Sequence, residues 1–212
     1  SRDWSSDVCS SDLGVEAIVM TASGCGVTVK EYGHLLAHDA AYAERAEKIS
    51  ALTQDLAEIL PTFEKELAAR VKISKRVAWH PPCTLQHGQQ IRGKVESVLR
   101  AVGVDVTLCA DSHLCCGSAG TYSLTQPELS RRLRDNRLKA LESGAPEVIV
   151  TANIGCQAHL AGAGRTPVRH WIELVEEALA DAVRLALSRA ITDARPPQLE
   201  FSDRKSTRLN SS

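Results

Sequence analysis

Four cysteines have side chains and a spacing that suit metal binding. They are Cys83, the adjacent pair Cys115 and Cys116, and Cys156. There are 31 residues between Cys83 and Cys115 and 39 residues between Cys116 and Cys156. A disulfide between adjacent cysteines is strained, and nothing in the sequence suggests export, so thiols that serve metal or redox chemistry are favoured over a disulfide scaffold. Four thiolates match the ligand count of a [4Fe–4S] cluster and also of a structural zinc site.

The elements that must position these cysteines are short strands alternating with longer helices. Apolar, β-branched runs predict strands at 16–20, 76–80, 104–108 and 147–151. Apolar residues at helical spacing predict helices over 49–59 and 91–102, the second ending at Gly103, and a last helix from Trp171 to about residue 190. Another helix is expected to begin at a capping box formed by Thr125 and Glu128, to bury Leu129 and to end at Gly144.

This alternation predicts an α/β fold built from βαβ modules with a parallel sheet. Each cysteine of the set follows a predicted strand, and the carboxyl ends of parallel strands lie along one edge, so the four should meet in one crevice. Helices that begin after these turns would favour thiolates through their N-terminal N–H groups. Gly117 and Gly155 flank the cysteines and leave room for a metal centre.

Part of the sequence is repeated. Residues 16–25 (EAIVMTASGC) align without gaps to residues 147–156 (EVIVTANIGC), and each segment is a strand followed by a turn that carries a cysteine. We interpret the match as a duplication. Residues 14–72 would then be the C-terminal part of a first module, residues 75–190 a complete second module, and residues 191–202 a polar tail.

The sequence motifs around the cysteines resemble those of a known protein family. The pattern Cys83…Cys115-Cys116-Gly117…Cys156 resembles the cysteine-rich CCG domain of heterodisulfide reductases and related iron–sulfur electron carriers. Segments 80–87 (HPPCTLQH), 115–122 (CCGSAGTY) and 151–156 (TANIGC) are similar to the iron–sulfur subunits of bacterial glycolate oxidase, also called glycolate dehydrogenase. This likeness covers nearly all of residues 14–180.

The resemblance implies an electron-transfer subunit rather than a catalytic one. It implies an iron–sulfur cluster of the [4Fe–4S] type held by Cys83, Cys115, Cys116 and Cys156, with Cys25 as the last ligand of the incomplete first module. The partners would be flavoprotein dehydrogenase subunits that carry the FAD and pass electrons through this chain towards the respiratory chain. The complex would lie in the cytoplasm or at the inner face of the cytoplasmic membrane.

One position departs from the family pattern, which ends in C-x-x-C where this chain has Asn153. Four cysteines rather than five therefore remain for the second module, which favours a conventional four-ligand cluster or an altered site.

Other functions stay open at this point. Four thiolates could form a structural zinc module for subunit assembly. The adjacent cysteines could act as a thiol–disulfide pair, although no C-x-x-C motif supports that chemistry. The equivalent subunit of a lactate or glycerol-3-phosphate dehydrogenase would look alike, because the substrate binds to another chain.

Several further residues have ordinary structural interpretations. Cys109 ends an apolar strand and is expected to pack in the core, as are Trp79 and His80. His159 follows Cys156 by one helical turn and could contact a cluster, replace a ligand, or simply pack.

Composition excludes some classes of partner. The formal net charge of -1 provides no electrostatic footprint for nucleic acid or an anionic membrane, and no apolar run approaches the ~18 residues of a membrane span.

The two ends of the sequence do not look native. Residues 3–12 and 203–212 can be back-translated as opposite strands of one DNA segment that resembles a sequencing adapter. We therefore expect residues 1–13 and 203–212 to be non-native and Cys9 to have no function. We also expect the ferredoxin part of such a subunit to lie upstream of this fragment.

Overall fold

The computed structural model describes residues 14–163 and 165–193. The two segments expected to be non-native, with Cys9, lie outside these residues. So does most of the predicted polar tail, whose first residues belong to the last helix, which runs to Asp193.

A four-stranded parallel sheet forms the centre of the fold, in the order β4-β3-β5-β6. Its strands are β3 (Arg76–His80), β4 (Asp105–Leu108), β5 (Val148–Thr151) and β6 (Val168–His170). The predicted α/β fold with a parallel sheet is confirmed. Strand β6 was not predicted, because its three residues carry no apolar run long enough to signal a strand.

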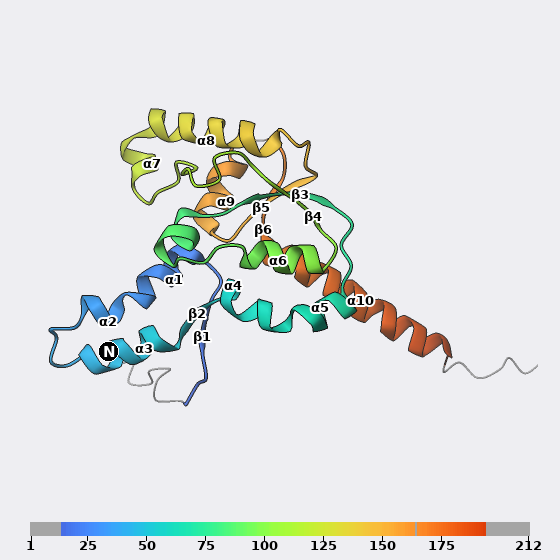
Figure 1. Cartoon of the computed structure of the whole chain (residues 1–212), viewed down its shortest axis with the longest axis horizontal. Coiled ribbons are helices and arrows are strands. Elements are labelled where there is room, and N and C mark those ends of the chain that lie inside the picture. Colours follow the sequence, from blue (N-terminus) through green and yellow to red (C-terminus); the bar gives the residue numbers. More distant parts are fainter. Residues whose placement is uncertain (1–13, 164, 194–212) are drawn as a thin grey trace, which may run out of the picture.

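Helices cover both faces of this sheet (Figure 1). On one face, α6 (Lys94–Ala101) and the first turns of α10 (Trp171–Asp193) bury Val77 and Trp79 of β3 in the larger core. On the other face, α8 (Pro127–Glu142) and α9 (Ile154–Ala161) pack over Ala78 and Ile149, with three cysteines in the same core. Successive strand residues point to opposite faces, so the apolar run of β3 supplies both cores.

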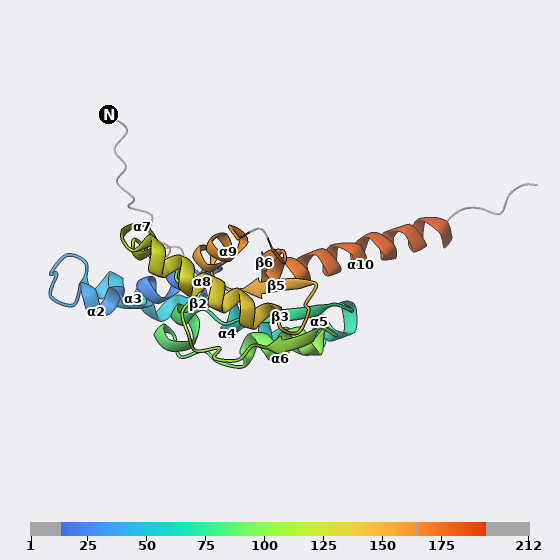
Figure 2. The same ribbon diagram turned by 90° about the horizontal axis from the view of Figure 1, so that it is seen from above.

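The N-terminal part contains a smaller sheet and a series of helices. Strand β1 (Ile18–Met20) pairs in parallel with β2 (Thr53–Asp55). Figure 2 shows this part on one side of the molecule and α10 projecting on the other. The remaining elements are α1 (Ser23–Lys30), α2 (Tyr32–Leu35), α3 (Ala43–Leu52), α4 (Leu56–Ile59), the 3-10 helix η1 (Leu60–Phe63) and α5 (Glu64–Arg70).

Two helix predictions were wrong in part. The helix expected over 49–59 is interrupted by β2, because Asp55 forms a capping box with Glu58 and starts α4 as a new helix. The capping box expected at Thr125 is absent, since its hydroxyl donates to the carbonyl of Thr121 instead, and Leu129 is 46% exposed.

The two copies of the repeated segment touch each other. The backbone N–H of Ser23 donates to the carbonyl of Ala152 at 3.0 Å, and the Ser23 and Thr84 hydroxyls are hydrogen-bonded at 2.8 Å. The Gln89 amide donates to the Ser23 carbonyl and to Asp55 at 3.1 Å and 3.0 Å. These contacts hold α1 against the second module, while the boundary between two modules stays a prediction.

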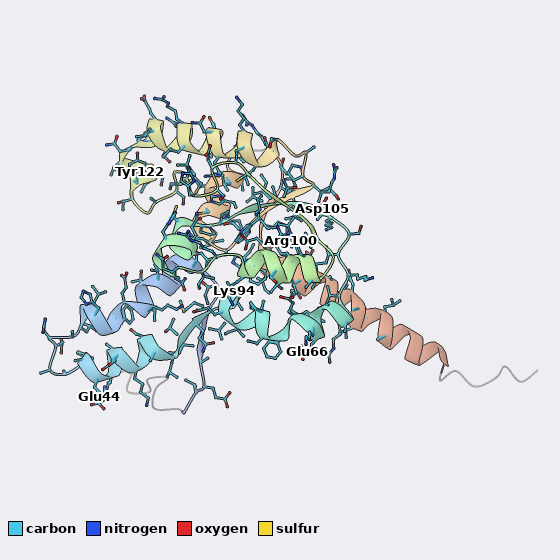
Figure 3. All side chains as sticks on the ribbon, in the orientation of Figure 1. Glu44, Glu66, Lys94, Arg100, Asp105 and Tyr122 are labelled. Atoms are coloured by element: carbon cyan, nitrogen blue, oxygen red, sulfur yellow. The ribbon has the colours of Figure 1, made fainter. Side chains whose placement is uncertain are left out.

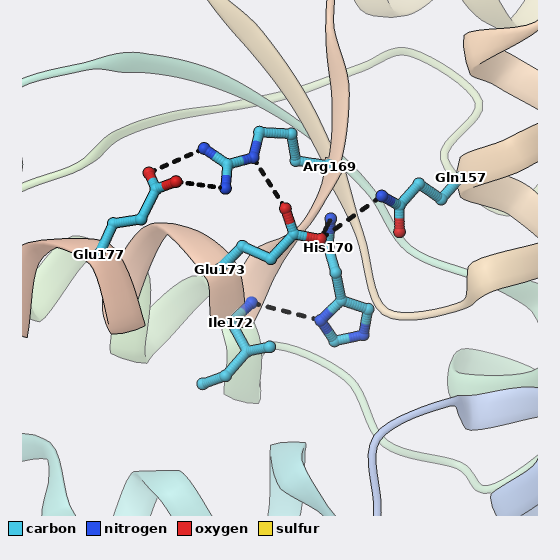
Figure 4. Close-up of polar contacts among 6 residues, drawn as sticks. All are labelled: Gln157, Arg169, His170, Ile172, Glu173 and Glu177. Atoms are coloured by element: carbon cyan, nitrogen blue, oxygen red, sulfur yellow. Dashed lines mark hydrogen bonds and ion pairs between the residues drawn. The ribbon is translucent and has the colours of Figure 1, made fainter.

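An arginine fixes the junction of β6 and α10 (Figure 4). Arg169 donates to Glu173 at 2.8 Å and to both carboxylate oxygens of Glu177 at 2.8 Å and 2.7 Å. The hydrogen bonds to Glu177 and then to Glu173 raise the pKa of Arg169. Partial burial opposes ionisation of Glu173, but the bonds from Arg169 and from the His170 N–H outweigh it, so the pKa of Glu173 is lowered.

Some charged side chains lie on the outside of the helices, as Glu44 on α3 and Glu66 on α5 illustrate (Figure 3). Within the described part of the chain, no helix combines the length and apolar character needed to cross a membrane.

Candidate metal centre

Three loops at the carboxyl edge of the sheet carry the four cysteines. Cys83 follows β3 and stands at the start of η2 (Thr84–Gly88), a π-helical turn of a kind often found at functional sites. Cys115 and Cys116 lie in the loop after β4, and Cys156 lies in the first turn of α9 after β5. The topology gathers residues that are far apart in the sequence, as the sequence predicts.

The loop that carries Cys115 and Cys116 is held down by a glycine. Gly117 has φ +93°, and a Cβ atom there would lie 2.4 Å from the carbonyl oxygen of Ser130 on α8. The Ser130 hydroxyl donates to the Gly117 carbonyl at 2.8 Å, and the Gly117 N–H donates to the Cys115 sulfur at 3.2 Å. A side chain at this position would therefore push the cysteine pair away from α8.

Cys156 is supported by the start of α9. Asn153 precedes this helix, and its amide Nδ2 donates to the Cys156 sulfur at 3.6 Å rather than capping the helix backbone. The position of a possible fifth cysteine is thus occupied by a hydrogen-bond donor to the fourth one. The free N–H groups at the helix start favour a thiolate in the first turn.

The cysteine thiols perturb one another strongly. Hydrogen bonds from Cys116 and then Cys83 lower the pKa of Cys115 to about 2. A hydrogen bond from Cys116 lowers the pKa of Cys156 to about 5, outweighing the opposing effect of burial. The pKa values of Cys83 and Cys116 are raised, chiefly by their hydrogen bonds to Cys115. A metal that takes all four sulfurs must displace the protons that they still carry.

A histidine lies within the cysteine set. A ring nitrogen of His80, the Cys116 sulfur and the Cys156 sulfur are all within 4.8 Å of one another, and all three residues are buried. Core packing was expected for both Trp79 and His80. Trp79 lies in the larger core, but His80 faces the cysteines. The two-residue period of β3 was the signal that could have placed it on this face.

Arg137 on α8 clamps the loop after β4. Its guanidinium donates to the Asp111 and Leu114 carbonyls at 2.6 Å and 2.5 Å, and to the Cys109 sulfur at 3.1 Å, while its side chain is 3% exposed. On the other side, the Gln86 amide donates to the Ser112 carbonyl at 2.9 Å. Neither residue was singled out in the sequence, because both act on a loop more than 20 positions away.

The other candidates lie outside the cysteine set. Cys109 is buried in the core, as expected, and accepts its hydrogen bond from Arg137. Cys25 is exposed on α1. The His159 ring contacts the hydroxyl and the carbonyl of Ser130 at 3.3 Å and 3.4 Å, so it packs against α8.

The donor set fits a soft metal centre. Thiolate ligands select iron–sulfur clusters, zinc and copper(I) over magnesium or calcium. Cys116 and Cys156 are buried, while Cys83 and Cys115 are half-buried. A cavity of about 290 Å³ lined by Cys115, Leu133 and Arg137 adjoins the half-buried side.

Comparison with known protein families identifies this part of the chain. Residues 77–161, which include all four cysteines, match the family model described as the CCG cysteine-rich domain. The resemblance inferred from the cysteine motifs is therefore confirmed.

Curated relatives extend the likeness beyond this CCG domain. The chain is 60% identical over 168 residues to the "Glycolate oxidase iron-sulfur subunit" of Escherichia coli K12, which covers 79% of this chain and 41% of the relative. It is 28% identical over 146 residues to the "Probable glycolate oxidase iron-sulfur subunit" of Bacillus subtilis 168, covering 68% and 33%. It is 26% identical over 148 residues to "Lactate utilization protein A" of Bacillus licheniformis, covering 69% and 62%. The chain thus spans less than half the length of the two glycolate oxidase relatives.

Proposed function

We propose that this chain is part of an iron–sulfur electron-transfer subunit of a flavin-dependent glycolate (2-hydroxy-acid) dehydrogenase. The observation that carries the proposal is the convergence of Cys83, Cys115, Cys116 and Cys156 at the carboxyl edge of one sheet. The CCG family match and the name of the 60% identical relative support it.

The four cysteines would hold the cluster, which we propose to be of the [4Fe–4S] type. The bound cluster would supply one-electron transfer, at a potential set by burial and hydrogen bonding to sulfur. The chain provides that environment through the Gly117 N–H on Cys115 and the Asn153 amide on Cys156. Such donors stabilise negative charge on sulfur and so favour the more reduced state.

The partners and location follow from the same proposal. Flavoprotein subunits with bound FAD would oxidise the hydroxy acid and pass electrons to this chain, which would relay them towards the respiratory chain. The complex would work in the cytoplasm or at the inner face of the cytoplasmic membrane. Cys25 would belong to the first module, because it lies in the repeated segment at the position that corresponds to Cys156.

Anaerobic reconstitution of the 212-residue chain with iron and sulfide tests the cluster. We expect a brown product with broad visible absorption, bleached by dithionite. Serine variants of Cys83, Cys115, Cys116 and Cys156 should each lose most of this absorption. Cys109→Ser is the matched control, because Cys109 is buried beside the set without belonging to it, and it should keep its colour. A colourless wild-type chain would contradict the proposal.

A structural zinc module is the second candidate, and one distance favours it. Zn–S bonds of about 2.3 Å place two sulfurs of a tetrahedron about 3.8 Å apart, and the His80, Cys116 and Cys156 ligand atoms already lie within 4.8 Å. This function predicts a colourless, redox-silent chain that holds about one zinc ion. Elemental analysis of anaerobically purified protein separates the two functions.

The substrate of the complex can be identified with the flavoprotein partner. A flavoprotein dehydrogenase encoded beside this gene should reduce the cluster when glycolate is added. Reduction by lactate or glycerol 3-phosphate and not by glycolate would reassign the complex while leaving the electron-transfer role intact.

A further inference from the structure

His80 is the last residue of β3 and lies on the same face of the sheet as the cysteines. Val77 and Trp79 point into the core on the α6 side, whereas Ala78 belongs to the core on the α8 side. The two-residue period of a strand therefore directs His80 to the α8 side, where Cys116 and Cys156 are buried. The side chain of His80 is 0% exposed.

Both ring nitrogens of His80 are buried, and the polar group that its ring faces within hydrogen-bonding reach is the Cys156 thiol. A neutral imidazole has one donor and one acceptor nitrogen, and leaving either unsatisfied in the interior is destabilising. Buried polar groups in native proteins nearly always have a partner, and the partners that the fold offers His80 are the cysteine sulfurs of the proposed metal centre.

The distances show what could bind it. A ring nitrogen lies within 4.8 Å of the Cys116 and Cys156 sulfurs. Metal–nitrogen bonds of about 2.0–2.1 Å and metal–sulfur bonds of about 2.3 Å bring ligand atoms of a tetrahedron to within about 3.6–3.8 Å of one another. Side-chain movements of about an ångström would therefore let the three atoms bind a common metal ion.

A partner for the second ring nitrogen lies on the neighbouring strand. His80 is the register partner of Thr151 on β5, and adjacent strands lie about 4.8 Å apart with their paired side chains on one face. The Thr151 hydroxyl is also buried without a hydrogen-bond partner among the described residues. Histidines that bind metal usually donate their other ring N–H to such a group, which fixes the ring orientation.

We propose that His80 is a direct metal ligand of this centre, alongside Cys116 and Cys156, and that the Thr151 hydroxyl orients its ring. The inference rests on the proposed metal centre and adds a nitrogen donor to its four thiolates.

Pulsed electron paramagnetic resonance tests the ligand directly. The 212-residue chain is labelled with ¹⁵N-histidine, reconstituted anaerobically with iron and sulfide, and reduced with dithionite. We expect a strong hyperfine coupling to a histidine nitrogen that is lost in His80→Ala. His170→Ala is the matched control, because His170 also ends a strand of this sheet but its Nδ1 accepts from the Ile172 N–H at 3.3 Å. It should keep the coupling.

Two further measurements separate ligation from packing. Cobalt(II) titration of the metal-free chain should show affinity reduced by at least about 100-fold in His80→Ala, at the upper end of what loss of an outer-shell partner causes. His80→Cys restores a donor atom, so it should recover cobalt affinity without recovering the nitrogen coupling. If His80→Leu recovered cobalt affinity instead, the site would need only a side chain of similar volume at this position, and the role of His80 as a ligand would be overturned.

The outcomes distinguish this inference from the proposed function. A cluster without histidine coupling overturns the role of His80 and leaves the electron-transfer proposal standing. A chain that forms no cluster but binds cobalt through His80 overturns the electron-transfer proposal and supports the ligand. A chain that binds neither metal overturns both.

Discussion

Removing the Arg137 guanidinium should loosen the loop that presents Cys115 and Cys116. In Arg137→Ala, the Asp111 and Leu114 carbonyls lose donors at 2.6 Å and 2.5 Å, and the Cys109 sulfur loses one at 3.1 Å. These bonds connect α8 to the first part of the loop after β4, while Ser130 on α8 holds the end of the loop at Gly117. Without them the loop keeps its anchor at Gly117 and the hydrogen bond from Gln86 to the Ser112 carbonyl.

The magnitude follows from the number and kind of hydrogen bonds. A bond from a charged donor contributes about 1.5–3 kcal/mol. Asp111 and Leu114 are exposed residues, so water can replace part of what their carbonyls lose, and the lower value applies to each. Two such bonds predict a loss of about 3 kcal/mol in the free energy of unfolding.

Urea denaturation of the 212-residue chain, followed by circular dichroism, measures this loss. With a slope of about 2 kcal/mol per molar urea, a loss of about 3 kcal/mol lowers the midpoint by about 1.5 M. Arg137→Lys keeps a cation but not the planar fork, so its midpoint should fall between those of the wild type and the alanine variant.

Arg132→Ala is the matched control, because Arg132 is an exposed arginine on the same helix. Its unfolding free energy should change by no more than about 0.5 kcal/mol. If Arg137→Ala shifted the midpoint no more than this control, the clamp would have no energetic importance and the reasoning would be refuted.

Three other perturbations have defined outcomes. Gly117→Ala should cost at least about 2 kcal/mol of stability, seen by urea denaturation, since its Cβ would lie 2.4 Å from the Ser130 carbonyl oxygen at φ +93°. Gln89→Leu should speed amide hydrogen exchange in α1, because it removes hydrogen bonds that tie α1 to the second module. Folding lowers the pKa of Glu173 below its ordinary 4.5, so its stabilising contribution is present above that pH and is lost as the pH falls through the lower folded value. Glu173→Gln should therefore flatten the acid side of a stability–pH profile.

Each of these variants has a control in the chain. Gly93→Ala has a similar φ of +73° but no atom within 4 Å of the new Cβ, so it should cost less than Gly117→Ala. Gln54→Leu changes an exposed glutamine on β2 and should leave exchange in α1 unchanged. Glu176→Gln changes an exposed carboxylate on α10 and should leave the acid profile unchanged. If a variant and its control changed the measured quantity equally, the contact proposed for that variant would not have the predicted effect.

The sequence by itself determined the fold class and the grouping of the four cysteines. Strands β3 and β5 are apolar on both faces, which is the pattern of a buried parallel strand and is visible without any tertiary information. Because each cysteine follows a strand, the rule that parallel strands end at one edge was enough to bring them together. Metal binding by these four residues stays a prediction.

Only the tertiary structure decided the elements and contacts that depend on neighbours distant in sequence. Strands β2 and β6 are three residues each and exist because an adjacent strand pairs with them. The capping box expected at Thr125 fits the local pattern, but the chain at that point is already in the short helix α7 (Tyr122–Thr125). Arg137 and His80 look like ordinary helix and strand residues until the loop after β4 folds over them, because burial and partners are set by long-range packing.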